Sequence, residues 1–476
     1  MVYRFRWVFC QLDALRHCFP PNLRQYLNEL PETLDETYDR ILKGISKAQK
    51  NNAHRLLQCL TVAARPLLVE ELAELLAFDF HALTAGGIPT LKEDWRWDDQ
   101  EEAILSICSG LITIIPGANS RVVQFSHFSV KEYLTSSRLA QSTDGEVSRF
   151  RIGLEPAHTI LAQACLATLL QLDEQAGGSD AKMSPLVNYA AQYWVGHAQF
   201  EKVSSRIREG MDDLFDSSKP HFAAWVWVHD IDESWSIFSP LSRDGAGSPL
   251  YYASFCGFYD LAESLIMKRS DQVNALGGRV KAPLPAALSK GHLRVANLLY
   301  SHGAVVDVRD DQERTPLYVA SSRGQVDTIR WLLDHGADAN ARGVSFITPL
   351  IQATDNKHLE AVQVLLEHNA DTNLHSAGGR TPLLWALDLR KPEGMVVEIM
   401  RRLLEHGADP NIRDDSTAIH RASSSGLLEA ARLLLSYGAR VDEKDDMGRT
   451  PFQLAASEGH DEITKLLLEH GAVPQL

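Results

Sequence analysis

One stretch decides the fold of this chain: Thr315-Pro316-Leu317, then Gly324, then Trp331-Leu332-Leu333, closed by His335-Gly336-Ala337-Asp338. The same order of residues occurs seven times between residues 241 and 476. Its proline slot is filled in turn by Pro249, Pro283, Pro316, Pro349, Pro382, Ala418 and Pro451. Successive slots are 34, 33, 33, 33, 36 and 33 residues apart. A fixed period of this length indicates a stack of similar units, each packed on its neighbours.

Each copy predicts two helices. Threonine before proline begins a helix well, because the hydroxyl caps free amides and proline at the first helical position loses no hydrogen bond. The first helix ends at a glycine such as Gly324, and the second, with its apolar face, ends at Gly336. Where glycine is absent from these stops the chain has Asn356 and Asn369, and asparagine tolerates the left-handed conformation best among other residues.

The period and the Thr-Pro-Leu start resemble ankyrin repeats over residues 241–476. This resemblance implies an α-solenoid with short β-hairpins that binds protein. Two copies depart from the pattern. Arg269 replaces the expected glycine in the first copy, and the fifth copy has extra residues, Leu389-Arg390-Lys391-Pro392-Glu393-Gly394, which we expect to form a solvent loop.

Composition excludes several function classes. The 476-residue chain carries a net charge of −15, which opposes nucleic acid or an anionic membrane as main partner. Its six cysteines include no Cys-x-x-Cys pair, which suits a reducing compartment. The start of the sequence has too short an apolar core for a signal peptide. We therefore expect a cytoplasmic protein.

Residues 29–140 predict a winged-helix-like domain. Helices are expected over 32–47, 55–61, 69–77 and 101–109, followed by strands at 111–115 and 121–125. The helix that would enter a DNA groove contains Glu101 and Glu102 and no lysine or arginine. Such a helix needs donors for phosphates and bases. We therefore expect this domain to pack on protein.

Three segments of the first half resemble fungal NACHT-type proteins. They are Leu30–Tyr38, Phe125–Leu134 and Tyr189–Trp194. The resemblance implies the STAND class of signal-transducing NTPases, built with a winged helix, a helical spacer and ankyrin repeats. The Gly-x-x-x-x-Gly-Lys-Ser/Thr phosphate loop of such NTPases does not occur in this sequence. We therefore expect the C-terminal part of a NACHT-type protein, lacking the NTPase core.

In that family the histidine corresponding to His127 contacts the nucleotide phosphate. Here His127 would be a nucleotide sensor only with an NTPase core, so we favour a partly buried histidine with local hydrogen bonds. No cofactor is expected.

Four segments follow from these patterns: an N-terminal helical remnant (1–28), the winged-helix-like domain (29–140), a helical spacer (141–240) and about seven ankyrin repeats (241–476). Spacer helices are expected at 157–170, 186–197, 203–215 and 222–228. Trp194, Trp225, Trp227 and Trp235 lie in or beside them, and we interpret them as core residues rather than as a cofactor site.

No metal site or catalytic set is predicted. His302, His335, His368, His406 and His470 share one slot, but stacked helices lie about 8–10 Å apart, too far to converge on one ion. We expect these imidazoles to bond free carbonyls at the helix ends. The acidic pairs fall in hairpin tips, whereas acid–base chemistry needs a cleft. The chain is therefore predicted not to be an enzyme.

A partner-binding face is predicted from the first helices. An alanine recurs four residues after the proline slot, and the residue before it is Tyr252, Ala286, Val319, Gln352, Trp385, Arg421 or Leu454. Tyrosine, tryptophan and arginine dominate binding energy at interfaces. Packing within the stack is the alternative for each. The hairpin tips add acidic residues: Asp310, Asp311, Glu313, Asp414, Asp445 and Asp446. We expect a protein partner on the concave face, with a basic patch against this rim.

Two hypotheses for the function remain open. In the first, the chain is the non-enzymatic ankyrin recognition array of a NACHT-type signalling protein without its NTPase module. In the second, it is a free-standing ankyrin adaptor that tethers two proteins.

Overall fold

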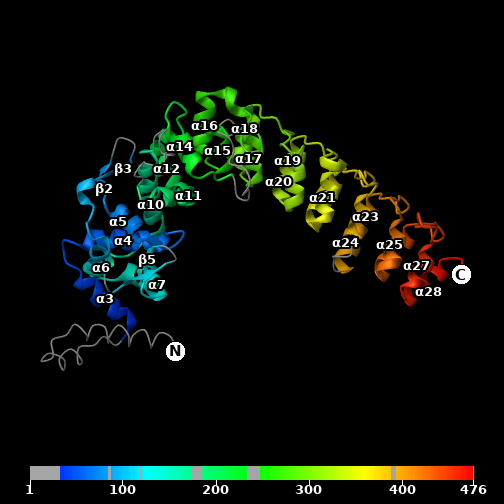
Figure 1. The fold of residues 1–476 in the computed structure, drawn as a ribbon, viewed down its shortest axis with the longest axis horizontal. Coiled ribbons are helices and arrows are strands. Elements are labelled where there is room, and N and C mark those ends of the chain that lie inside the picture. The colour runs from blue at the N-terminus through cyan, green and yellow to red at the C-terminus, as the bar shows by residue number, and fades with distance from the viewer. Residues whose placement is uncertain are drawn as a thin grey trace. The chain divides into compact units, whose positions relative to one another are not determined.

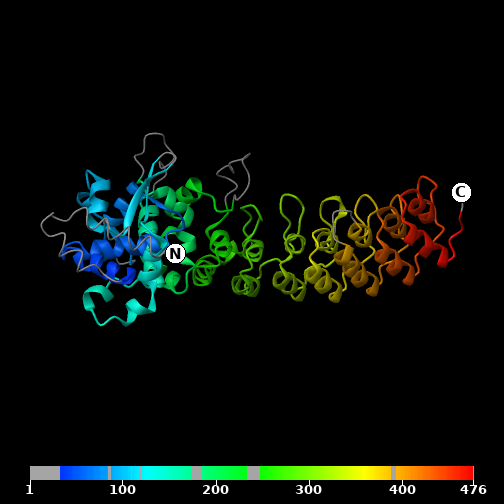
Figure 2. The same ribbon diagram turned by 90° about the horizontal axis from the view of Figure 1, so that it is seen from below.

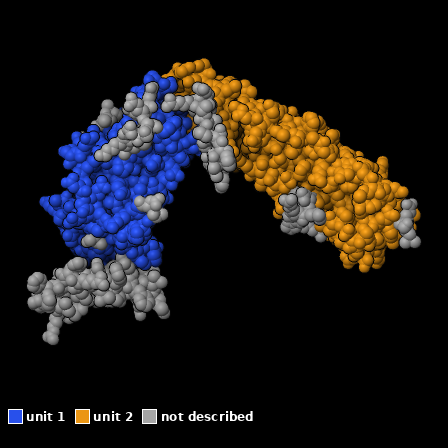
Figure 3. All heavy atoms as spheres, viewed as in Figure 1, with its two compact units in different colours: residues 1–239 blue, residues 240–476 orange. Residues whose placement is uncertain are grey.

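The computed structural model describes residues 33–83, 87–108, 110–117, 120–172, 184–232, 247–387 and 393–474. The chain forms two compact units, residues 1–239 and 240–476 (Figure 3). The expected N-terminal remnant (1–28), Trp235 and the inserted residues 388–392 lie outside the described residues.

The first unit begins with the predicted winged helix, whose elements appear in the expected order. They are α3 (Leu34–Gly44), α4 (Lys50–Val62), β1 (Leu67–Leu68), α5 (Val69–Leu76), α6 (Gln100–Cys108), β4 (Ile112–Pro116) and β5 (Arg121–Phe125). The strands form an antiparallel sheet of order β1-β5-β4, in which Val123 pairs with Leu67 on one side and Ile114 on the other. The two-residue strand β1 was not predicted, because two residues show no alternation.

A second hairpin lies between α5 and α6 and was also not predicted. It pairs β2 (Phe78–Leu83) with β3 (Pro89–Leu91), followed by the 3-10 helix η2 (Glu93–Trp95). Next to it, the buried carboxylate of Glu74 is paired with Arg96 at 2.6 Å. Glu71 is paired in the same way with Arg65 at 2.5 Å. Each buried acid of α5 therefore has the partner that a buried charge requires.

Helices make up the rest of this unit: α7 (Phe128–Thr135), α8 (Ser137–Gln141), α9 (Gly145–Ser148), α10 (Leu154–Leu169), α11 (Val187–Ala198), α12 (Val203–Arg206), α13 (Arg208–Leu214) and α14 (His221–Val228). The helix predicted over 203–215 is divided at Ile207. Helix α10 packs on both α4 and α11, so the winged helix and the spacer share one core.

Two of the spacer tryptophans are core residues, as predicted. Trp194 and Trp225 are fully buried with ring centroids 5.3 Å apart, and the indole N–H of Trp225 donates to Ala191 O at 3.0 Å. The prediction is wrong for Trp227, whose side chain is 55% exposed. Helix α14 is apolar on every side, so its last turn leaves one large side chain in solvent.

The second unit is the predicted array of helix pairs (Figures 1 and 2). The first helices are α15 (Pro249–Phe255), α17 (Pro283–Ser289), α19 (Pro316–Arg323), α21 (Pro349–Asp355), α23 (Pro382–Ala386), α25 (Ala418–Ser425) and α27 (Pro451–Ser457). The second helices are α16 (Tyr259–Lys268), α18 (Leu293–Ser301), α20 (Val326–Asp334), α22 (Leu359–Glu367), α24 (Glu393–Glu405), α26 (Leu428–Ser436) and α28 (Asp461–Glu469). All seven first helices begin at the predicted slot.

The predicted helix stops are confirmed with one exception. Gly324 and Gly336 take φ angles of 65° and 85°, and Asn369 takes 61°. The prediction for Asn356 is wrong, because its φ is −83° and the left-handed residue is Lys357, at 65°. Lys357 lies 33 residues after Gly324, so the repeat period holds even where a long side chain occupies the stop.

The fifth repeat absorbs part of its extra residues in a helix. Helix α24 has 13 residues, whereas α22 and α26 have 9 each. Glu393 and Gly394 are its first two residues, which corrects the expectation that they belong to a solvent loop. A helix with more turns takes up additional chain without breaking backbone hydrogen bonds.

Hydrogen bonds from one side-chain slot connect neighbouring repeats. Asn373 Oδ1 accepts the amide of Asp409 at 2.9 Å, and Asn373 Nδ2 donates to Gly407 O at 3.1 Å. An asparagine or aspartate accepts an amide of the next repeat in the same way at Asn274, Asp307, Asn340, Asn411 and Asp442. These bonds satisfy backbone groups that the turns leave free.

Candidate partner-binding face of the array

The recurring histidines have the structural role that the sequence predicts. The imidazole Nδ1 of each lies 2.7–2.9 Å from the carbonyl oxygen four residues earlier, at the end of the second helix. The five are His302, His335, His368, His406 and His470. Their ring nitrogens are therefore engaged in capping. Over the described ranges, no group of three or more His, Cys, Asp or Glu is arranged to hold a metal ion.

His127 caps α7 and belongs to a buried polar chain. Its Nδ1 accepts the backbone amide of Ser129 at 3.3 Å and lies 2.6 Å from Ser129 Oγ. Ser129 Oγ in turn lies 2.8 Å from the hydroxyl of Tyr38 on α3. Because Nδ1 accepts, the remaining proton of the neutral ring is on Nε2. The favoured interpretation of His127 as a locally bonded histidine agrees with these contacts.

The predicted face divides into buried and half-exposed positions. Tyr252, Ala286 and Leu454 are buried, with Tyr252 fully enclosed. The interpretation of Tyr252 as a partner-facing residue is therefore wrong: its ring packs against Tyr251 at 5.3 Å, inside the first repeat. The half-exposed positions are Val319, Gln352, Trp385 and Arg421, which lie on four consecutive first helices.

Three predicted residues come together between the fifth and sixth repeats. Asp414 accepts from Arg421 at 2.5 Å and from Arg380 at 3.2 Å. The Arg380 guanidinium lies 5.4 Å above the ring centre of Trp385. Burial raises the pKa of Asp414, but hydrogen bonds from Arg421 and Ser416 outweigh that effect and the net shift is downward. This Trp385–Arg380–Asp414–Arg421 cluster is an ordered aromatic and charged surface.

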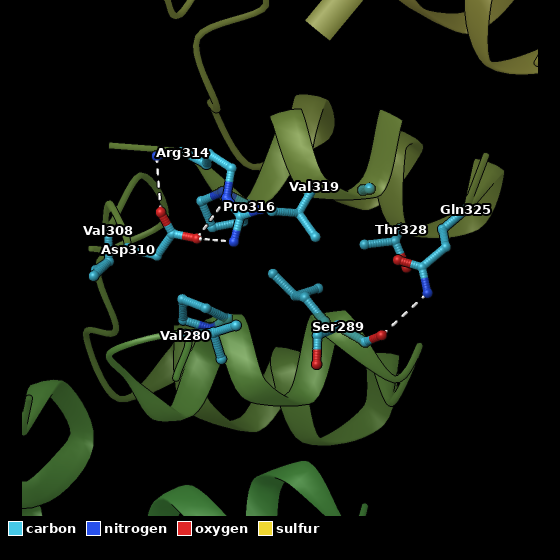
Figure 4. A pocket seen from close by; sticks show the side chains of 12 residues that line it. Val280, Ser289, Val308, Asp310, Arg314, Pro316, Val319, Gln325 and Thr328 are labelled. Carbon is cyan, nitrogen blue, oxygen red and sulfur yellow. Dashed lines mark hydrogen bonds and ion pairs between the residues drawn. The ribbon is translucent and has the colours of Figure 1, made fainter. Parts of the chain in front are cut away.

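Gln352 and Val319 continue the same row. The amide of Gln352 donates to the hydroxyl of Tyr318 at 2.8 Å, which joins α21 to α19. Val319 lies on α19 next to Tyr318 and faces α17 across a hollow (Figure 4).

The acidic tips do not form the free negative rim that the sequence suggested. Asp310 accepts the amides of Gln312 and Arg314 and pairs with the Arg314 side chain at 2.6 Å. Asp445 makes the same contacts in its own hairpin: it accepts the amide of Arg449 and pairs with the Arg449 side chain at 2.9 Å. In both, the carboxylate closes its own hairpin.

Two further acids of the tips are paired across repeats. Asp311 binds Lys281 at 2.6 Å, and Asp446 forms an ion pair with Arg413. Glu313 is exposed at a φ of 57°. Since the charges of Asp310, Asp311, Asp414, Asp445 and Asp446 are compensated locally, the expectation of an acidic rim is corrected.

Sequence reasoning missed the histidines at the start of the second helices. His358 Nε2 lies 3.2 Å from Ser322 O, and His460 Nε2 lies 3.3 Å from Ser424 O, each in the preceding repeat. Their signal was present, because His292, His358 and His460 all follow the first-helix stop of their own repeats.

Family models of known proteins match two parts of the chain. A family model described as ankyrin repeats (3 copies) matches residues 250–343, 345–414 and 392–476. A second, described as GPI inositol-deacylase, winged helix domain, matches residues 38–147. No helix within the described ranges is both long enough and apolar enough to cross a membrane.

Several individual proteins are similar to parts of the chain. The azaphilone pigments biosynthesis cluster protein L of Monascus ruber is 33% identical over 299 residues, 59% of this chain and 61% of that protein. The cyclin-dependent kinase inhibitor 2A of Monodelphis domestica is 38% identical over 76 residues, 15% of this chain and 44% of that protein. The ankyrin repeat domain of Bcl-3 aligns with a TM-score of 0.43 and 27% identity, covering 47% of this chain and 99% of that domain.

The matched region thus spans about three fifths of the Monascus ruber protein and less than half of the kinase inhibitor. The chain carries ankyrin repeats over residues 250–476, and a winged helix domain of the GPI inositol-deacylase type over residues 38–147.

Proposed function

We propose that this chain is a non-enzymatic scaffold that binds a protein partner along the first helices of its ankyrin array. The observation that carries the proposal is the row Val319, Gln352, Trp385 and Arg421. These four residues occupy one slot on consecutive helices and differ in chemistry, and all four are half-buried, so that part of each side chain reaches solvent. The neighbouring positions of these helices carry the same residue types in successive repeats, and their side chains are buried or hydrogen-bonded.

A variable row on a repeating framework suits recognition of one extended surface. Aromatic and arginine side chains contribute most to binding when they are held in place before contact. The pairing of Asp414 with Arg380 and Arg421 holds the surroundings of Trp385 in this way. We therefore assign the strongest contribution to Trp385.

The sequence led us to expect a partner with a basic patch. We propose that such a patch would lie only against the hairpin tips of the repeats. Glu313 is the exposed acid that would meet it, together with Asp415, whose side chain is 76% exposed and whose ion pair with Arg421 is long, at 3.9 Å. The compensated aspartates offer little attraction, since each already faces a cation and the side chains of Asp310, Asp414 and Asp445 are buried.

The signalling context is a second part of the proposal. The winged helix match and the ankyrin repeats support the recognition array of a NACHT-type signalling protein, active in the cytoplasm. The alternative is a free-standing ankyrin adaptor. An in-frame phosphate-loop sequence upstream of Met1 in the gene favours the first, and its absence favours the adaptor.

Comparative capture tests the proposed binding face. The full chain and its Trp385→Ala and Gln352→Ala variants are immobilised and exposed to cell extract. Proteins that bind the face are retained by the parent chain and lost from both variants. Tyr252→Ala is the control for damage to folding, because that side chain is fully buried. Equal retention by all folded variants would contradict the proposal.

A further inference from the structure

A hollow opens between α17 and α19, the first helices of the second and third repeats (Figure 4). Its floor is formed by the buried residues Pro285, Leu288, Pro316 and Ala320. Three half-buried valines, Val280, Val308 and Val319, surround the opening. Figure 4 shows Val319 directed from α19 into the space above α17. The lining is therefore mostly apolar.

Two residues of α17 that line the hollow are smaller than their counterparts in the first repeat. In the first repeat, the corresponding slots hold the large side chains Tyr251 and Phe255. In the second repeat they hold Pro285 and Ser289, which cannot fill the same volume. Well-packed interiors leave few voids larger than a water molecule, so an open apolar space within a repeat stack is unusual.

The size of the hollow limits its occupant. The enclosed part of the hollow measures about 20 Å³, and the space counted with its open mouth measures about 340 Å³. Small-molecule sites span roughly 300–1,000 Å³ of well-enclosed volume. Because the enclosed part holds about one water-sized group, the hollow takes the tip of one apolar side chain, whose other atoms lie in the mouth, rather than a cofactor.

The sequence around the hollow carries an excess of positive charge. Residues 279–325 contain seven lysines and arginines and four acids, in a chain whose net charge is −15. Arg314 and Lys281 are paired with Asp310 and Asp311. Arg323 is exposed and donates to the uncharged backbone oxygen of Ser289 at 3.1 Å, so its charge is not neutralised there. Burial lowers the pKa of Arg323, and the nearby positive charges of Arg279 and Arg314 lower it further.

We propose that this hollow binds one apolar side chain of the partner protein, carried on an acidic segment of that partner. The apolar lining takes up the side chain, and Arg323, which is bonded to the lining residue Ser289, attracts the flanking carboxylates. The inference rests on the proposed function and adds the chemistry of the partner at one place on the array.

Methyl NMR of the full chain tests the proposal directly. Valine and leucine methyl groups are labelled, and the chain is titrated with the peptide acetyl-Asp-Glu-Leu-Glu-Asp-amide. Resonances of Val280, Leu288, Val308 and Val319 should shift with the peptide. The shifts should vanish when alanine replaces leucine in the peptide, and shrink when lysines replace its acids. They should also weaken as salt is raised, because the flanking contacts are exposed.

Two variants act as matched controls. Ser289→Phe fills the hollow and should abolish the shifts, whereas Ser457→Phe, at the same slot of the last repeat, should leave them unchanged. Arg323→Ala, which keeps the hollow open, should weaken peptide binding several-fold. No shift at the four residues, an equal response to the lysine peptide, or shifts that depend on dilution of the chain alone would overturn the proposal. The last result would assign the hollow to a second copy of the chain.

The failure of this inference can be told apart from failure of the proposed function. A protein whose capture is lost in Trp385→Ala but kept in Ser289→Phe would overturn the hollow as a binding site and leave the wider binding face in place.

Discussion

Gly324 lies directly against the imidazole ring of His358 in the next repeat: a Cβ atom on this glycine would come within 2.5 Å of His358 Nδ1. The same approach recurs between Gly257 and His292, at 2.6 Å, and between Gly426 and His460, at 2.7 Å. These helix stops therefore need glycine for two reasons. The backbone takes the left-handed conformation, and the imidazole ring packed against it leaves no room for a side chain. The close pairs link these three first helices, α15, α19 and α25, to the repeats that follow them.

This relationship predicts unequal effects of one substitution at two stops. Gly324→Ala should destabilise the third and fourth repeats more than Gly291→Ala destabilises the second. Both residues are left-handed, at 65° and 76°, but a Cβ at Gly291 meets nothing within 4 Å. The left-handed turn costs each variant about 1–2 kcal/mol, and the clash adds about 1–3 kcal/mol at Gly324.

Hydrogen-exchange mass spectrometry of the full chain measures this difference as local protection of α19 to α22. Equal loss of protection in the two variants would show that the histidine ring moves aside at no cost.

The side-chain ladder between repeats predicts a second difference. Asn373→Ala removes the acceptor for the Asp409 amide and the donor to Gly407 O. Since a net hydrogen bond contributes about 0.5–1.5 kcal/mol, protection around α24 should fall by about 1–3 kcal/mol. Asn373→Asp keeps the acceptor, as Asp307 and Asp442 do in other repeats, and should therefore lose about half as much protection as Asn373→Ala. Identical exchange in the alanine and aspartate variants would argue against the ladder as a link.

A third prediction concerns pH and a buried histidine pair. His197 Nδ1 lies 2.8 Å from His158 Nδ1, and its Nε2 lies 2.9 Å from the Tyr189 hydroxyl. Burial lowers the pKa of His197 to about 4, with a further contribution from His158. The folded state therefore resists a proton that the unfolded chain accepts below about pH 6.5. This contribution to stability is complete above that pH and is lost as the pH falls toward 4.

Urea unfolding followed by tryptophan fluorescence tests this, because seven of the nine tryptophans lie in residues 1–239. The parent chain should lose about 2 kcal/mol more between pH 7 and pH 5 than His197→Gln, which cannot titrate. If the difference in unfolding free energy between the two proteins is the same at pH 7 and at pH 5, His197 is not the group responsible. The other histidine of the pair, His158, and the nearby Lys131 are present in both proteins.

The helical repeats were predictable because the residues that recur in each repeat begin and end its helices for known physical reasons. Thr315 caps α19 through a bond from the Tyr318 amide at 3.2 Å, and the same slot begins every first helix. The stop at Lys357 could not be predicted from residue type, since lysine has no preference for a positive φ. Counting 33 residues from Gly324 places the stop at Lys357, whereas residue type favoured the neighbouring Asn356.

The binding face was harder to predict, because burial depends on neighbours that a single slot does not show. Tyr252 shares its slot with Trp385 but is enclosed by Tyr251 and the first repeat. The charges of Asp310 and Asp445 are visible in the sequence, but their ion pairs with Arg314 and Arg449 depend on the hairpin turn that brings residues four apart together. The volume of Pro285 and Ser289 was the missed signal for the hollow.

Photo-crosslinking at single positions tests the central claim most directly. A photoreactive amino acid is placed at Gln352 or Trp385 in the binding row, or at Tyr437, which is 41% exposed at the end of α26. The proposed function predicts that one protein is crosslinked from positions 352 and 385 in cells, and that it is not crosslinked from position 437. Crosslinks to that protein from position 437 alone, or equally from all three positions, would contradict it.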